Sequence, residues 1–132
     1  MSFNEALAQQ PDWVQIWSYW ITAIVFAAAL VALIQPGARK LGAAIVILTA
    51  LTSALTYWIF LELGFVRLLG LGHLVFWTPL VVILWRGLRS EAPPPTPARW
   101  LIWACLATLV VSLGFDLVDT IRYLLGERAP LA

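Results

Sequence analysis

The sequence is poor in charged residues and cysteine, and each shortage excludes a class of protein. Charged residues make up 11% of the 132 residues and apolar residues 62%, a balance outside that of water-soluble globular domains. The single cysteine, Cys105, excludes an intramolecular disulfide and a CxxC redox pair. The net charge of +1 gives no overall basic field of the kind that attracts nucleic acid. Phosphate-loop, GxSxG and HExxH motifs are absent from the sequence, which therefore predicts neither a cofactor nor a common catalytic site.

Long apolar runs are what the sequence has instead. A helix of about 20 apolar residues crosses the hydrocarbon layer of a bilayer, and four such runs are present. Turn-forming and charged residues separate them, including a segment with four prolines at 90–98. The sequence therefore predicts an all-α, single-domain integral membrane bundle of four transmembrane helices. The expected spans are roughly residues 13–34, 41–63, 67–87 and 100–122.

The cations near the ends of these runs predict an orientation. Arg39 and Lys40 lie in the first connection, and Arg86, Arg89 and Arg99 flank the Pro-rich loop. Short cytoplasmic loops of membrane proteins carry an excess of Lys and Arg. We therefore expect both connections on the cytoplasmic side and both termini on the outer face. This arrangement is typical of a multi-pass protein of a plasma membrane, such as the bacterial inner membrane, with the lipid bilayer as its main partner.

Ionisable residues within or next to the spans gather toward the expected outer face. An ionisable residue inside the membrane costs about 2.5 to 3.5 kcal/mol on insertion scales and so indicates a function or a partner. At a helical rise of 1.5 Å per residue, Asp116 lies roughly 24 Å above Trp100 and His73 roughly 21 Å above Gly87, so the two can meet. The candidate ion- or proton-binding residues are Asp116, Asp119, His73 and Glu62, with Arg67 and Arg122 as charge-pair partners.

Two interpretations of these residues stay open. They form either a cation or proton site or a structural network of ion pairs that holds helix ends together. His73 is correspondingly either a pH-sensitive group or a hydrogen-bonded structural residue. A stripe of small and polar residues below Asp116, with Thr108 and Ser112, indicates either close helix packing or the lining of a water-filled path.

Three function classes follow from these features. The first is an oligomeric protein for ion conduction or small-solute transport, because a lone four-helix bundle fills its own interior and a pore needs several copies. The second is a non-catalytic accessory or assembly subunit of a larger membrane complex, with the Trp-rich first helix as a contact face. The third, a membrane enzyme using Asp116, Asp119 and His73, has less support because few polar groups surround them. The sequence favours transport by a homo-oligomer.

Overall fold

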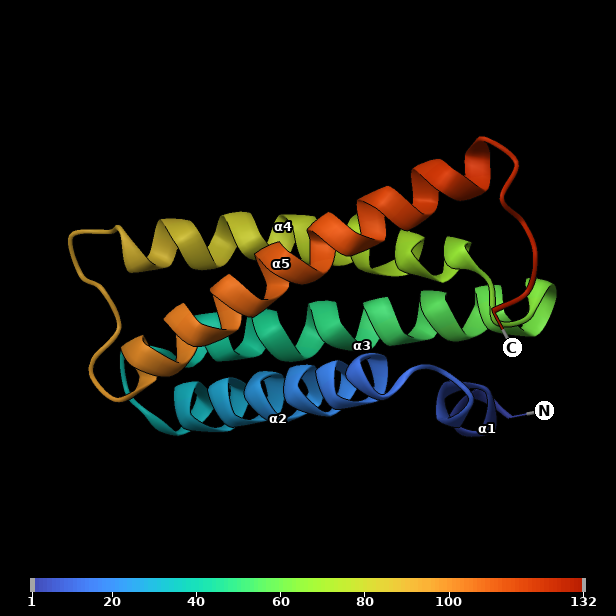
Figure 1. Cartoon of the computed structure of the whole chain (residues 1–132). Coiled ribbons are helices and arrows are strands. Elements are labelled where there is room, and N and C mark those ends of the chain that lie inside the picture. Colours follow the sequence, from blue (N-terminus) through green and yellow to red (C-terminus); the bar gives the residue numbers. More distant parts are fainter. Residues whose placement is uncertain (1, 132) are drawn as a thin grey trace.

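The computed structural model describes residues 2–131, which form a bundle of helices with no strand among them (Figure 1). A short helix, α1 (Phe3–Ala8), precedes the bundle, and a 3-10 turn, η1 (Arg67–Leu69), leads into its third member. The four long helices are α2 (Asp12–Ile34), α3 (Arg39–Leu63), α4 (Gly70–Leu88) and α5 (Ala98–Leu124). All four are long and apolar enough to cross a membrane, η1 extending the third of these segments to Arg67–Leu88. The expected all-α bundle of four candidate transmembrane helices is confirmed.

The four helices pack in a ring that follows the chain. Helix α3 contacts α2 and α4, and α5 contacts α4 and α2. Figure 1 shows the two ends of the chain and the turn at 64–66 together at one end of the bundle, which we call the terminal end. The connections at 35–38 and 89–97 lie together at the opposite end, which we call the loop end.

Glycines in the following turns terminate helices at both ends of the bundle. Gly37, Gly64 and Gly126 follow α2, α3 and α5 with positive φ angles of 90°, 81° and 119°, a backbone region that glycine enters without steric cost. At the loop end the side chain of Gln35 donates to the carbonyl of Thr96 (3.2 Å) and accepts from the amide of Ala98 (3.0 Å). The first connection therefore holds the Pro-rich loop against the start of α5.

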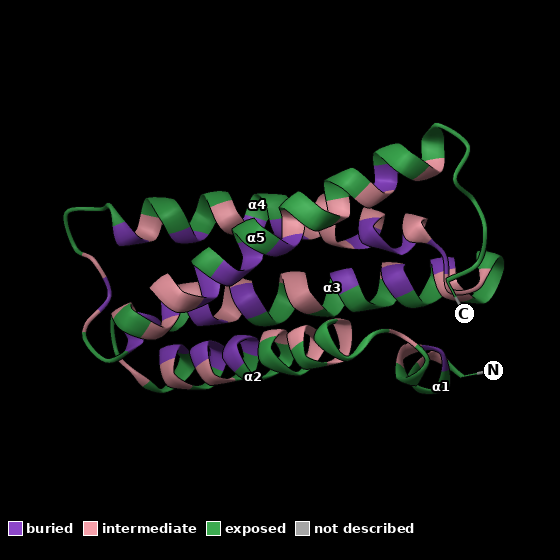
Figure 2. Ribbon diagram, viewed as in Figure 1, coloured by how far each residue is buried: buried purple, intermediate pink, exposed green. Residues whose placement is uncertain are grey.

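The apolar core lies mainly in the half of the bundle nearer the loop end. The buried residues of α2 all fall at Ile24 or later in the helix (Figure 2). Alanines at 28 and 32 are fully buried and let neighbouring helices approach closely, and a Cβ on Gly42 would meet the backbone of Leu33 at 2.8 Å. Toward the terminal end α5 diverges from α2 (Figure 1).

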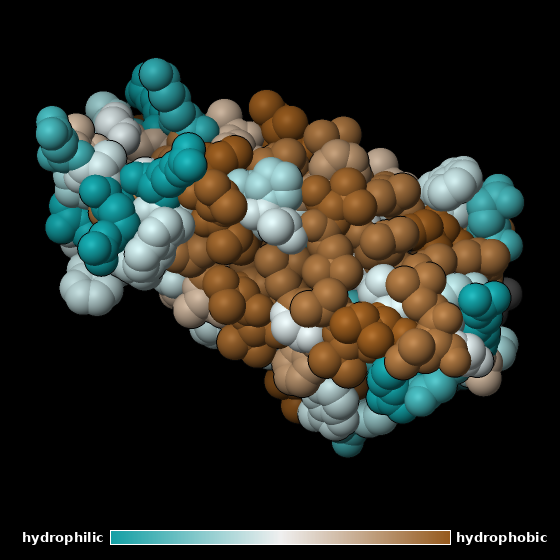
Figure 3. Space-filling model, turned by 90° about the horizontal axis from the view of Figure 1, so that it is seen from above, coloured by the Kyte–Doolittle hydropathy of each residue, from teal (hydrophilic) through white to brown (hydrophobic). Residues whose placement is uncertain are grey.

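The outer surface of the bundle is an apolar band between two polar ends. Figure 3 shows hydrophobic residues across the middle of one face and hydrophilic residues gathered at its two ends. Large apolar side chains on all four helices are exposed, among them Phe26, Leu61, Val82 and Val118. Such a surface is stable in a hydrocarbon layer and not in water, which agrees with four membrane-spanning helices.

Candidate functional site

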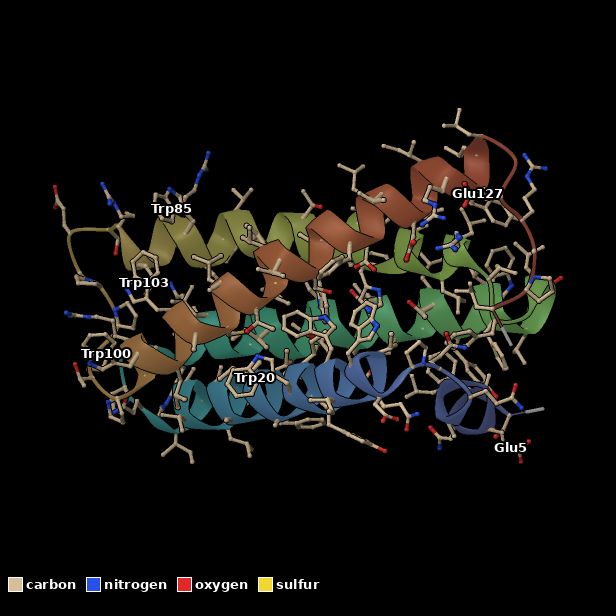
Figure 4. The ribbon with its side chains drawn as sticks, viewed as in Figure 1. Glu5, Trp20, Trp85, Trp100, Trp103 and Glu127 are labelled. Atoms are coloured by element: carbon tan, nitrogen blue, oxygen red, sulfur yellow. The ribbon has the colours of Figure 1, made fainter. Side chains whose placement is uncertain are left out.

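Charged side chains form a network at the terminal end. Arg67 of η1 donates to Oδ1 of Asp119 at 2.9 Å, and its Nε lies 3.6 Å from Oε2 of Glu127. Arg122 donates to the same oxygen of Glu127 at 2.7 Å. All four side chains are partly exposed, and Figure 4 labels Glu127 at the edge of the bundle. The network ties the start of the third span to the end of the fourth.

The backbone of the C-terminal tail brings Glu127 into this network. The turn at Gly126 folds the chain back after α5, and the amide of Leu131 then donates to the carbonyl of Phe65 at 2.7 Å. The side chain of Gln10 donates to the carbonyl of Leu131 at 2.9 Å. The N-terminal segment, the turn at 64–66 and the tail therefore close the terminal end together.

A second pair of ionisable side chains lies deeper in the bundle. Nδ1 of His73 on α4 faces Oδ2 of Asp116 on α5 at 3.6 Å, just beyond hydrogen-bond distance. The side chains are 29% and 17% exposed, and Ser112 donates to the same carboxylate oxygen at 3.5 Å. The His73 ring packs against the ring of Trp77 with centroids 4.5 Å apart. Within residues 2–131, Nδ1 of His73 is buried and has no hydrogen-bond partner.

Two glycines allow this close approach of α4 to its neighbours. A Cβ on Gly70 would lie 3.0 Å from Cα of Asp116, and a Cβ on Gly72 would overlap the hydroxyl of Thr56 on α3. Both glycines therefore serve as contact points for adjacent helices, as small residues do in membrane bundles. His73 follows directly in the chain and is thereby placed at the level of Asp116.

The six residues singled out in the sequence do not form a single cluster in the structure. Asp119 pairs with Arg67 near the surface, whereas Asp116 faces His73 further inside. Glu62 lies exposed near the end of α3, and its side chain has no hydrogen bond or ion pair with any other residue in 2–131. Arg122 contacts Glu127, a residue beyond the expected fourth span at 100–122.

Two threonine hydroxyl groups inside the bundle connect neighbouring helices. Thr108 of α5 accepts from the indole nitrogen of Trp20 on α2 at 3.1 Å and donates to the carbonyl of Ala104 at 2.9 Å. Trp77 of α4 donates to Thr49 on α3 at 3.3 Å. These bonds favour the packing interpretation over a water-filled lining in this part of the bundle.

The described residues do not provide a metal centre. Nowhere in 2–131 do three or more His, Cys, Asp or Glu side chains gather closely enough to hold a metal ion. The arrangement offers instead one carboxyl and one imidazole group that face each other inside the bundle, with a charged network between them and the terminal end.

The helices and their apolar surface place the chain in the class of multi-pass membrane proteins with four spans. The chain matches no protein-family model, no curated protein and no solved structure.

Proposed function

We propose that the protein moves protons or small cations across a membrane as a homo-oligomer, with Asp116 and His73 as its ion-binding pair. The observation that carries this proposal is the 3.6 Å approach of these two side chains inside a bundle of apolar spanning helices. Ionisable groups at such a depth are costly, and in membrane proteins they mark ion pathways and proton relays.

The chemistry of the pair suits a proton. A carboxyl group and an imidazole both take up and release protons, and a small shift or one bridging water joins them across 3.6 Å. Small metal cations such as Na⁺ and Ca²⁺ favour several oxygen ligands, whereas only Asp116 and Ser112 bring side-chain oxygens together here. We therefore place the proton first among the candidate ions.

The orientation and the oligomer are parts of the same proposal. The loop end carries Arg39, Lys40, Arg86, Arg89 and Arg99, which favours the cytoplasmic side for that end and the outer side for both termini. The loop-end half of a single bundle is filled by fully buried apolar side chains such as Leu84 and Ile102. A continuous path would therefore run between copies of the chain rather than through one bundle.

A flux measurement in liposomes tests the proposal. The purified protein is reconstituted with a pH-sensitive dye inside, and a potassium gradient with valinomycin sets the membrane potential. We expect wild-type protein to accelerate the pH change and Asp116→Asn to slow it by at least about tenfold, because a carboxamide cannot release a proton. Glu91→Gln, an exposed loop position far from the pair, is the matched control and should keep the wild-type rate. Equal rates for wild type and Asp116→Asn, or wild-type liposomes no faster than empty ones, would reject proton transport.

An apolar groove favours a second candidate function, that of an accessory subunit in a larger membrane complex. The groove has a volume of about 610 Å³ and lies between α2 and α5. Its lining consists of Trp13, Ile16, Trp17, Trp20, Val111 and Phe115. A transmembrane helix of a partner would fill such a surface by close packing. A photo-crosslinker at Phe115 should then capture one stoichiometric partner in native membranes, and a crosslinker at the exposed Val82 of α4 should not.

A further inference from the structure

The charges of the chain are divided unequally between its two ends. Five of the eight cations lie at the loop end, where Glu91 is the only acidic residue, and the other acids lie toward the terminal end. The ion pairs found within residues 2–131 likewise all lie toward the terminal end. The loop-end cations therefore form a concentrated positive region without carboxylate partners in the described part of the chain.

Aromatic rings stand beside these cations at the corner where α4 ends and α5 begins. Trp85 and Trp103 pack edge to face with centroids 5.8 Å apart, and the guanidinium of Arg89 lies 5.1 Å from the centroid of the Trp85 ring. Arg99 donates to the carbonyl of Pro94 at 3.0 Å, which restrains its side chain beside the loop. Figure 4 shows the labelled Trp85, Trp100 and Trp103 gathered at this end.

We propose that this corner binds the headgroup of an anionic phospholipid. We name it the aromatic–arginine face and define it by Trp85, Arg89, Arg99, Trp100 and Trp103. Guanidinium groups bind phosphate oxygens through two parallel hydrogen bonds, and tryptophan rings prefer the headgroup level of a bilayer. Trp100 is 69% exposed and is free to lie against a bound lipid.

The surface next to the aromatic–arginine face fits the tail of the same ligand. Val82 and Ile83, one turn of α4 closer to the middle of the bundle than Arg86, are exposed apolar side chains. A ligand with an anionic head and hydrocarbon chains satisfies both surfaces, whereas an acidic peptide satisfies only the charged one. Because the local charge is strongly positive, a lipid with net negative charge should bind better than a zwitterionic one. This binding is independent of whether Asp116 and His73 carry protons.

Native mass spectrometry with defined lipids tests this proposal. The purified protein in detergent is mixed with equal amounts of phosphatidylglycerol and phosphatidylcholine, and the lipid retained on the protein is measured. We expect wild-type protein to retain mainly phosphatidylglycerol. Each arginine near an anionic lipid surface contributes about fivefold in affinity, so Arg89→Gln should weaken retention about fivefold and Arg89→Gln/Arg99→Gln about 25-fold. The single variant leaves the contact of Arg99 with the loop intact, so the test does not depend on the folding of the double variant.

Arg128→Gln is the matched control at the terminal end. Arg128 lies 5.2 Å from the ring centroid of Tyr123 and donates to the carbonyl of that residue at 3.2 Å, so it resembles Arg89 and Arg99 in its contacts. Its substitution should leave phosphatidylglycerol retention unchanged. Equal retention of the two lipids by wild type, an unchanged Arg89→Gln variant, or an equal loss in Arg128→Gln would overturn the proposal. Displacement of the lipid by inorganic phosphate would show that the phosphate group alone is recognised, and would overturn it as well.

Discussion

Replacing Gly72 by alanine tests whether close contact between α3 and α4 builds the site. A Cβ at this position would overlap Oγ1 of Thr56 and would lie 3.0 Å from the backbone nitrogen of Thr56 and 3.2 Å from the carbonyl oxygen of Thr52. Two of these three atoms belong to the backbone, so rotation of one side chain does not relieve the crowding. The helices must separate instead, and overpacking of this kind costs about 1 to 3 kcal/mol.

Gly114→Ala provides the matched comparison. Gly114 also lies inside a long helix, but a Cβ there would meet no atom within 4 Å. Each substitution should stabilise its helix by about 1 kcal/mol, because alanine has a higher helix propensity than glycine. The difference in the free energy of unfolding between the two variants therefore reports the cost of crowding at Gly72. We expect the free energy of unfolding of Gly72→Ala to lie about 1 to 3 kcal/mol below that of Gly114→Ala, measured by titration with SDS in mixed micelles. Thr56→Ala removes Oγ1, the nearest of the three crowding atoms, and should recover part of the loss in the double variant. Equal stability of Gly72→Ala and Gly114→Ala would refute the close-contact argument.

Two further predictions concern the ends of the bundle. Arg67→Gln removes both ion pairs of η1. Because those pairs are partly exposed, the substitution should lower the free energy of unfolding by only about 1 kcal/mol, and added salt should diminish this loss. A loss that salt leaves unchanged would contradict this. Gln35→Ala removes two hydrogen bonds that hold the Pro-rich loop and should lower the free energy of unfolding by about 1 to 3 kcal/mol. Residues 90–97 should then be more sensitive to limited proteolysis, and cleavage at the wild-type rate would contradict this.

The number and type of the long helices could be predicted from the sequence because each apolar run is long enough to cross a bilayer and ends at proline, glycine or charge. Helix α1 was missing from the prediction, although Ser2 and Glu5 form a capping box that the sequence contains. The helix is only six residues long, and its formation depends on contacts that a local pattern does not reveal. Phe3 of α1 packs against Phe60 and Phe65, which come from a distant part of the chain.

The levels of the ionisable residues could be worked out from the helical rise, and their partners could not. The rise per residue placed His73 and Asp116 at a similar height, and they lie 3.6 Å apart. Which side chain faces which depends on how each helix is rotated and tilted, and these angles are set by contacts such as those of Gly70 with Asp116. The part played by Glu127 depends on the turn at Gly126, whose direction follows from tertiary contacts of the tail.

The most direct test of the account is the protonation of His73 itself. It is the only histidine in the chain, so the ¹⁵N signals of an imidazole-labelled sample in micelles report this side chain alone. If Asp116 and His73 form a proton-binding pair, the signals should change between about pH 4 and pH 8, and Asp116→Asn should move the midpoint of that change. Signals that stay constant over this range, or a midpoint that is the same in wild type and Asp116→Asn, would contradict the assignment of the pair as the ion-binding site.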